Sequence, residues 1–265
     1  MPVTTNEPTT SEAKERVRTQ YGSVGDAYVK SVGHATGSDL QRMVELAAPR
    51  PTDCLLDIAT GGGHVARVFA PLVADVVASD LTPEILAHAE RSFAELGLTN
   101  VSMAVADAEE LPFGHASFDI VTCRIAPHHF PNPDRFVAEA SRVLRPSGRF
   151  VLVDSTVPEG DPGAFFNRFE LLRDPSHVRS LTVEAWMGMI ENAGLTATNV
   201  ESFRKRHDFD DWTSRSLMAD DDKAVLGRMM LEADDTVRGK FAVEVSDGNL
   251  VAFADTKTLF VALKS

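Results

Sequence analysis

The sequence predicts an α/β fold in which helices cover both faces of a doubly wound, mostly parallel sheet. Two observations support this prediction. Short apolar runs alternate with helical segments over most of the chain, and the runs are apolar throughout, as strands buried on both faces require. A glycine-rich turn joins the first run to the helix that follows it. Alternation of this kind is typical of a parallel sheet.

Seven segments have the length and composition of strands. Five of them precede residue 155 and alternate with helices, and two follow in the C-terminal part. They comprise residues 54–59, 73–79, 101–106, 118–123, 149–154, 196–206 and 249–263. The sequence therefore predicts a seven-stranded sheet.

Start signals mark several of the helices between these strands. Thr82 stands at an N-cap position with Pro83 in the first turn, and Asn132–Pro133 opens another helix in the same way. Apolar residues at helical spacing predict a helix over 182–194 and a helical stretch over 209–242.

The length of 265 residues suits one domain, residues 1–265. Residues 1–50 read as a helix–loop–helix cap and 51–154 as the cofactor-binding core. Residues 155–180 are turn-rich and aromatic. Together with 208–245 they are predicted to be helical cap insertions over an acceptor site.

Composition excludes several classes of partner. The net charge of −13 would repel a phosphate backbone, so no nucleic acid is expected. No apolar run approaches the roughly 18 residues of a membrane span. The first dozen residues lack the features of a signal peptide. We therefore expect a cytoplasmic protein, of undetermined oligomeric state.

The two cysteines, Cys54 and Cys123, both lie in apolar runs. Two buried free thiols are expected, in keeping with a reducing compartment. Cysteine and histidine spacing typical of zinc is absent, so no metal site is predicted.

The glycine-rich turn indicates a nucleotide-containing cofactor. Residues 61–66, GGGHVA, fit G-x-G-x-x-A, and a strand, a glycine turn and a helix N-terminus together present backbone N–H groups to a ligand. Asp80 ends the second strand, where a carboxylate accepts hydrogen bonds from ribose hydroxyls. These features alone suit NAD as well as other nucleotide cofactors.

Asp107, at the end of the third strand, distinguishes between these cofactors. From Leu55 to Asp154 the chain resembles class I S-adenosylmethionine (SAM)-dependent methyltransferases, and more narrowly the ubiquinone/menaquinone-biosynthesis type, methyltransferase type 11. The segments that carry the resemblance occur in the family's order: LLDIATGGGHVA, VVASDLTPEIL, ADAEELPF, SFDIVTCRIAPHHF and RVLRPSGRFVLVD. The resemblance implies a Rossmann-like fold, SAM as cofactor and methyl transfer to a small molecule, such as a quinone-like ring or a secondary metabolite.

The resemblance also assigns residues to the cofactor. In the core these are Asp57, Ala59, Gly61, Gly63, Asp80, Leu81, Asp107, Ala108 and Arg124. The first motif approaches the methionine part, Asp80 holds the ribose, and Asp107 meets the adenine amino group. The family's first glycine is replaced here by Ala59, which we expect to shift the loop slightly without abolishing binding. In the N-terminal cap, Tyr21, Tyr28 and His34 are candidates to cover the cofactor.

Candidate acceptor-binding residues follow the fourth and fifth strands. His128 and His129 lie at the carboxyl edge of the sheet, and either could act as a base or hold a structural hydrogen bond. We predict His129 as the substrate-facing member, because Pro127 constrains His128. In the segment 172–180, the side chains of Arg173, His177 and Arg179 could bind an anionic acceptor or tie the loop together.

Two other functions remain open from the sequence. A SAM-binding protein that does not methylate could be a cyclase, a sensor or a regulatory subunit. An NAD-dependent oxidoreductase would share the glycine turn and Asp80, but Asp107 within DAEELPF disfavours it.

Overall fold

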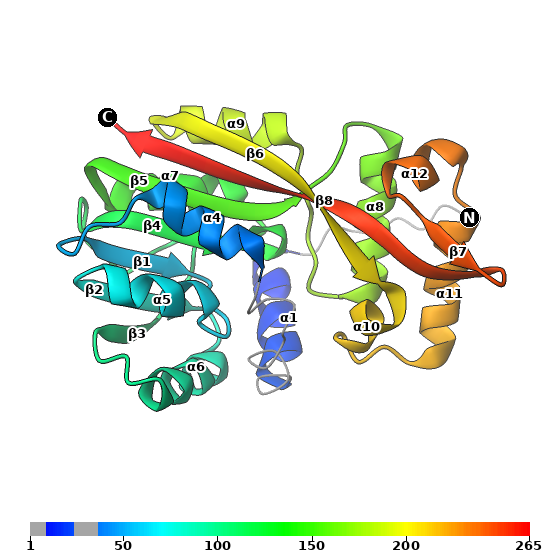
Figure 1. Cartoon of the computed structure of the whole chain (residues 1–265), viewed down its shortest axis with the longest axis horizontal. Coiled ribbons are helices and arrows are strands. Elements are labelled where there is room, and N and C mark those ends of the chain that lie inside the picture. The colour runs from blue at the N-terminus through cyan, green and yellow to red at the C-terminus, as the bar shows by residue number, and fades with distance from the viewer. Residues whose placement is uncertain (1–8, 24–36) are drawn as a thin grey trace.

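A computed structural model describes residues 9–23 and 37–265 and confirms the α/β fold. The sheet has the strand order β3-β2-β1-β4-β5-β8-β6, and β7 pairs with β8. Strands β1 to β5 are parallel, whereas β8 is antiparallel to both β5 and β6 (Figure 1). The strands are β1 Cys54–Ile58, β2 Asp75–Asp80, β3 Val101–Val105, β4 Phe118–Arg124, β5 Leu144–Thr156, β6 Leu195–Asp208, β7 Glu244–Ser246 and β8 Asn249–Lys264.

Helices lie on both faces of this sheet. The α-helices are α1 Thr10–Ser23, α4 Ser38–Ala47, α5 His64–Phe69, α6 Pro83–Glu95, α7 Pro133–Val143, α8 Asp161–Arg173, α9 Val183–Asn192, α10 Phe209–Ser214, α11 Asp220–Leu231 and α12 Asp235–Lys240. Two short 3-10 turns, η1 Ala70–Leu72 and η2 Pro127–His129, follow α5 and β4.

The two faces of the sheet build separate cores, because successive strand residues point to opposite sides. On one face Leu56 and Phe150 pack with α7 and with Trp186 of α9. On the other, Leu55 and Val151 pack with α4, α5 and α6. Both core faces are apolar, which explains why the central strands read as continuous hydrophobic runs.

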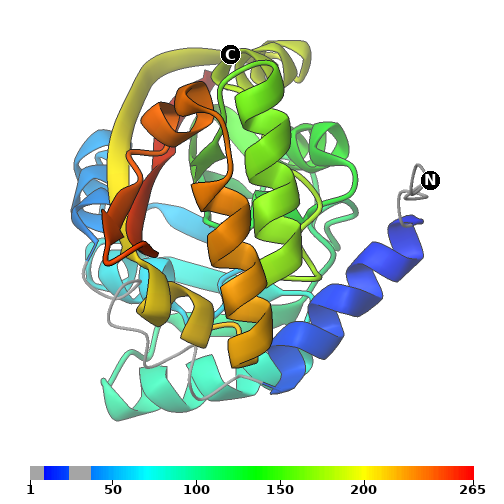
Figure 2. The same cartoon turned by 90° about the vertical axis from the view of Figure 1, so that its right-hand side faces the viewer.

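A third cluster forms a lobe beyond the carboxyl end of β5. Helices α8, α10, α11 and α12 pack there around Phe169, Trp212 and Phe253. Strands β6 and β8 continue from the main sheet into this lobe (Figure 1). Viewed from that end, α8 and α11 lie side by side in front of the sheet (Figure 2). The lobe therefore stands over the sheet edge that the sequence predicts to bind ligands.

The structure corrects three expectations from the sequence. The segment 155–180 is not merely turn-rich, because α8 occupies 161–173, starting after Gly160 with Pro162 in its first turn. Its buried residues share one face, but Glu170 is among them while Leu171 and Leu172 are exposed, which obscures the apolar stripe in the sequence. The stretch 209–242 is three short helices, and the part of the chain that the structure describes forms a sheet of eight strands. The added strand, β7, joins β8 through Asp247–Gly248, a dipeptide typical of tight hairpins.

The structure also bears on the predicted helix caps, the cysteines and the absence of a membrane span. Thr82 and Asn132 occupy N-cap positions with proline following, although neither side chain makes a cap hydrogen bond. Both cysteines are free, Cys123 buried and Cys54 only partly so. Across the described parts of the chain, no helix is long and apolar enough to cross a membrane.

Candidate active site

The loop after β1 is a left-handed turn. Ala59, Gly61 and Gly63 have φ angles of 53°, 53° and 77°. At Gly63 a Cβ would lie 2.3 Å from Cζ of Phe93, a buried residue of α6. Glycine is therefore required at this position both by the backbone and by the close approach of α6. Ala59 adopts the same backbone region despite its methyl group, so the departure from the family pattern leaves the turn intact.

Asp80, at the end of β2, holds this loop in place. Its Oδ2 accepts the Gly61 N–H at 3.0 Å and its Oδ1 accepts the Thr82 N–H at 3.0 Å. The side chain is buried, and burial raises its pKa. Each carboxylate oxygen can accept more than one hydrogen bond, so the group can still bind hydroxyl donors.

Asp57 lies fully buried beneath the loop. It accepts hydrogen bonds from the hydroxyls of Thr60 at 2.6 Å and Thr122 at 2.7 Å. Burial raises its pKa to about 6, opposed by these two bonds. The carboxylate thus fixes the loop and lies beside a cavity that we call the loop cavity.

The loop cavity encloses about 350 Å³, part of it open to solvent. Arg124 lines it but is held by Asp39, with Nε 2.5 Å from Oδ2. His64, the residue after the glycines, also lines it. Its side chain is 6% exposed, and neither ring nitrogen has a hydrogen-bond partner in the described structure. Burial lowers its pKa to about 4, so the ring is neutral at pH 7.

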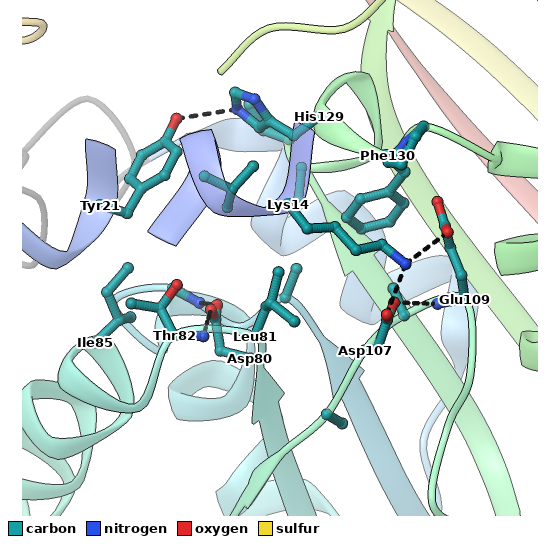
Figure 3. A pocket seen from close by; sticks show the side chains of 18 residues that line it. Lys14, Tyr21, Asp80, Leu81, Thr82, Ile85, Asp107, Glu109, His129 and Phe130 are labelled. Atoms are coloured by element: carbon teal, nitrogen blue, oxygen red, sulfur yellow. Dashed lines mark hydrogen bonds and ion pairs between the residues drawn. The ribbon is translucent and has the colours of Figure 1, made fainter. Parts of the chain in front are cut away.

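A larger cavity of about 720 Å³, the α1 cavity, lies between α1 and the ends of β2 and β3. Asp80, Leu81 and Asp107 line one side and Tyr21 the other (Figure 3), and Ala108 also lines the cavity. The predicted cofactor residues of β2 and β3 are thus brought together in one space.

Lys14 of α1 reaches across this cavity. Its Nζ lies 2.6 Å from Asp107 Oδ2 and 2.8 Å from Glu109 Oε2 (Figure 3). Lys14 and Glu109 were not predicted as site residues. Glu109 follows Asp107 by two positions and could have been suspected, whereas Lys14 lies on a helix with no motif.

The two histidines of η2 face different cavities. His129 lines the α1 cavity, with Nε2 2.9 Å from the Tyr21 hydroxyl and Nδ1 3.0 Å from the Ser176 carbonyl oxygen. Both of its ring nitrogens are therefore engaged. His128 lines another cavity, and its Nδ1 lies 2.7 Å from Asp154 Oδ1.

The His128–Asp154 pair is buried. When Asp154 is ionised it can only accept, so the hydrogen of this bond then lies on Nδ1 and Nε2 is the nitrogen that can take up a proton. Burial shifts the pKa values of the two groups in opposite directions. It lowers the pKa of His128 well below its ordinary value and raises that of Asp154 to about 7.

The cavity at His128, which we call the polar cavity, encloses about 960 Å³ between the sheet, α1 and the lobe. Ile125 and Tyr21 line both it and the α1 cavity. Its other lining residues include Gln20, Ser155, Glu170, Arg173, Asp174, Lys205, His207, Trp212, Arg215, Asp255 and Lys257. The sequence prediction found only His128, Tyr21 and Arg173 among them. Alternating polar residues in ADTKT, residues 254–258, were the available signal on β8.

The predicted acceptor residues are separated by the structure. Arg173 lines the polar cavity, but it pairs with Glu170 at 3.0 Å and lies over the Trp212 ring. His177 is buried with Nε2 2.9 Å from Asn167 Oδ1. Arg179 is exposed and lines none of these three cavities. Tyr28 and His34 lie outside the described residues.

The donor and acceptor groups fit SAM. The cofactor presents an ammonium group, ribose hydroxyls and an adenine amino group, all hydrogen-bond donors. Asp57, Asp80 and Asp107 offer acceptors along the adjoining loop and α1 cavities. His64 adds two buried nitrogens without a partner in the described structure.

Comparisons with known proteins agree with this site. The methyltransferase domain family matches residues 56–152. The uncharacterized methyltransferase YcgJ of Bacillus subtilis is 34% identical over 250 residues, 93% of this chain and 98% of that protein. The chain therefore belongs to the methyltransferase family, as the sequence predicted, and it is a SAM-dependent methyltransferase.

Two further proteins extend the comparison. A crystal structure from Bacillus halodurans C-125 has a TM-score of 0.84 at 41% identity, covering 86% of this chain and 99% of that one. The ubiquinone/menaquinone biosynthesis C-methyltransferase UbiE of Rickettsia prowazekii is 32% identical over 157 residues, 56% of this chain and 63% of that protein.

Proposed function

We propose that this enzyme transfers the methyl group of SAM to a small-molecule acceptor that binds in the polar cavity. The observation that carries the proposal is the junction of two cavities at the end of β4. Ile125 and Tyr21 line both. Ile125 has a φ of 52°, a strained conformation for a β-branched residue, and such strain is concentrated at functional sites.

The chain's own acidic residues would hold the cofactor. Asp80 would accept hydrogen bonds from the ribose, Asp107 would meet the adenine amino group, and Asp57 with the glycine loop would bind the methionine end. Bound SAM supplies an already activated methyl group. The protein then needs to align the acceptor and exclude water, which α1 and the lobe do by covering the two cavities.

His128 is the residue that we propose as general base. It faces the polar cavity, and Asp154 fixes its tautomer, whereas His129 has both ring nitrogens engaged. The proposal thus moves from His129, favoured by the sequence, to His128. A base is needed where the acceptor loses a proton, as a phenol or an activated ring carbon does. A quinone-like ring or a secondary metabolite that loses a proton on methylation would suit a site with such a base.

The positions of the two cavities support a proposed division of the chain into segments that bind the cofactor and segments that cover the acceptor. Residues 1–50 and 51–154 would form the cofactor cap and core. The segments 155–180 and 208–245 contribute α8, α10, α11 and α12 to the lobe, and they would roof the acceptor. The whole chain then works as one domain.

The test is ligand stabilisation followed by turnover. SAM and S-adenosylhomocysteine should raise the melting temperature and NAD should not, because a ligand stabilises the state that binds it. Release of S-adenosylhomocysteine with an acceptor would then separate a methyltransferase from a cyclase, sensor or regulatory subunit. Stabilisation by NAD alone would refute the proposal.

A further inference from the structure

One wall of the polar cavity is a row of polar residues on a sheet face that is apolar elsewhere. Ser155 of β5 pairs in register with Lys257 of β8, and Asp255 lies two residues from Lys257 on the same face. All three line the cavity. Further along this face, Val153 and Leu259 are paired and belong to a hydrophobic core. The face therefore changes from apolar to polar where the cavity begins.

Lys257 is held in place on this wall by two acceptors. It is 5% exposed, and its Nζ donates to Ser155 Oγ and to Asp255 Oδ2, the latter at 2.8 Å. The carboxylate compensates the buried positive charge. An ammonium group has three hydrogens, however, and the described residues supply only these two acceptors. One hydrogen of Lys257 is therefore available to a ligand in the cavity.

Ser155 offers a second hydrogen beside the first. Its Oγ accepts from Lys257, and its own hydroxyl hydrogen has no acceptor in the part of the chain that the structure describes. Because Oγ and Nζ are hydrogen-bonded to each other, the two available hydrogens belong to adjacent atoms. One oxygen atom of a ligand can accept from both.

His128, the proposed base, lines the same cavity and is a weak base there. Burial first, and then the charges of His129 and Lys257, lower its pKa well below the ordinary 6.5. A phenolic hydroxyl has a pKa of about 10. Transfer of a proton from a phenol to His128 is therefore unfavourable unless the negative charge left on the oxygen is stabilised. A fixed cation with a hydrogen to donate supplies this stabilisation.

We propose that Lys257 and Ser155 bind the hydroxyl oxygen of the acceptor and stabilise the oxyanion that forms when His128 takes the proton. This inference rests on the proposed function and names its acceptor class, a compound with an acidic hydroxyl such as a phenol or an enol. The O–H bond breaks, an N–H bond forms at His128 Nε2, and the electron pair stays on the oxygen, which accepts from the ammonium group and the serine hydroxyl. Lys257 is then a catalytic residue, because it contacts the reacting oxygen.

The ionisation of a bound phenol tests the proposal. The probe is 4-nitrophenol, titrated into the full chain with S-adenosylhomocysteine bound, and the absorbance of its phenolate gives the pKa of the bound hydroxyl. We expect binding to lower this pKa by about 1, which is a tenfold preference for the phenolate over the phenol. 4-Nitroanisole, which has no hydroxyl, should bind about tenfold more weakly than the phenolate. Equal binding of 4-nitroanisole, no binding of 4-nitrophenol or an unchanged pKa would overturn the proposal.

The absorbance of the probe separates its ionisation from that of the protein. The titratable and charged groups that interact with Lys257 through their charge are His128, Asp154, Glu170, Lys205, His207 and Asp255. None of these side chains absorbs where the nitrophenolate does. Comparison of the wild type and the variants over one pH range then cancels the influence of the groups that they share.

Variants assign the effect to Lys257. Lys257→Gln keeps a donor for Asp255 but removes the positive charge, so the pKa of the bound phenol should return towards its value in solution while S-adenosylhomocysteine affinity is unchanged. Ser155→Ala removes a smaller group, so it remains informative if Lys257→Gln does not fold, and it should raise the same pKa by less. Lys223→Gln, which changes a lysine paired with Asp220 on α11, is the matched control and should leave the pKa of the probe as in the wild type.

The two proposals fail in different ways. If S-adenosylhomocysteine does not bind to the wild-type chain, the proposed function fails. If it binds and 4-nitrophenol is bound as the phenolate, the assignment to Lys257 alone can fail. It does so if the pKa of the probe stays at its wild-type value in Lys257→Gln, or in Ser155→Ala where Lys257→Gln does not fold, or if the pKa changes equally in Lys223→Gln.

Discussion

Gly63→Ala should destabilise the fold by an amount that can be worked out from two terms. The first is the backbone, because φ is 77° and a left-handed alanine costs about 1–2 kcal/mol. The second is steric. The new Cβ would lie 2.3 Å from Cζ and 2.6 Å from Cε1 of Phe93, which is 3% exposed and packed in the core. Overpacking of this kind costs about 1–3 kcal/mol, for a total of about 2–5 kcal/mol.

Gly97→Ala is the matched control. Gly97 follows α6 with a φ of 69°, but a Cβ there would meet nothing within 4 Å. Gly97→Ala should therefore lower the free energy of unfolding only by the backbone contribution, about 1–2 kcal/mol. Urea unfolding of both variants gives the difference between their free energies of unfolding directly, provided that both show the same dependence on urea concentration. Equal losses of stability in the two variants would show that α6 moves aside and would refute the reasoning.

Three further predictions concern the candidate site. Asp80→Ala should weaken SAM binding at least tenfold by calorimetry, because hydrogen bonds to a charged group are worth about 1.5–3 kcal/mol; unchanged affinity in a folded variant would exclude the ribose role. His64→Leu should raise stability by about 1–3 kcal/mol near pH 7 and weaken SAM binding, since it removes two unpartnered buried nitrogens; a less stable variant would contradict this. The folded pKa of His64, about 4, lies below its ordinary 6.5, so wild-type stability should fall as pH drops through this window, and the variant should lose less. His128→Ala should keep SAM affinity and lose turnover, while the wild-type rate rises with pH as the His128–Asp154 pair loses its proton near pH 7; His129→Ala with the same loss would shift the assignment back to His129.

The central sheet was predictable because its signals are local. Strands β1, β2 and β4 and the second half of β5 are apolar runs, as buried parallel strands require, whereas β3 lies at the edge of the sheet. The glycine turn and the acidic residues at strand ends likewise follow from nearby sequence. The loop, Asp80 and Asp107 therefore lie where the pattern indicated.

The acceptor side was less predictable, because its residues are joined only by tertiary structure. Lys257 and Lys205 are brought together by the antiparallel pairing of β8 and β6, which are separated in sequence by α10, α11, α12 and β7. Which cavity each of the two histidines lines also depends on tertiary packing. His128 follows Pro127 in η2, and its ring lies against Asp154, a residue of another strand.

The position of Tyr21 has a thermodynamic consequence. Its hydroxyl lies 2.9 Å from His129 Nε2 and 3.2 Å from Asp174 Oδ2, and its ring lines both the α1 cavity and the polar cavity. A ligand that shifts this side chain from one cavity alters the walls of the other. Linkage requires the resulting coupling to be reciprocal. If the cofactor strengthens acceptor binding by some factor, the acceptor must strengthen cofactor binding by the same factor, and the product complex obeys the same rule when it dissociates.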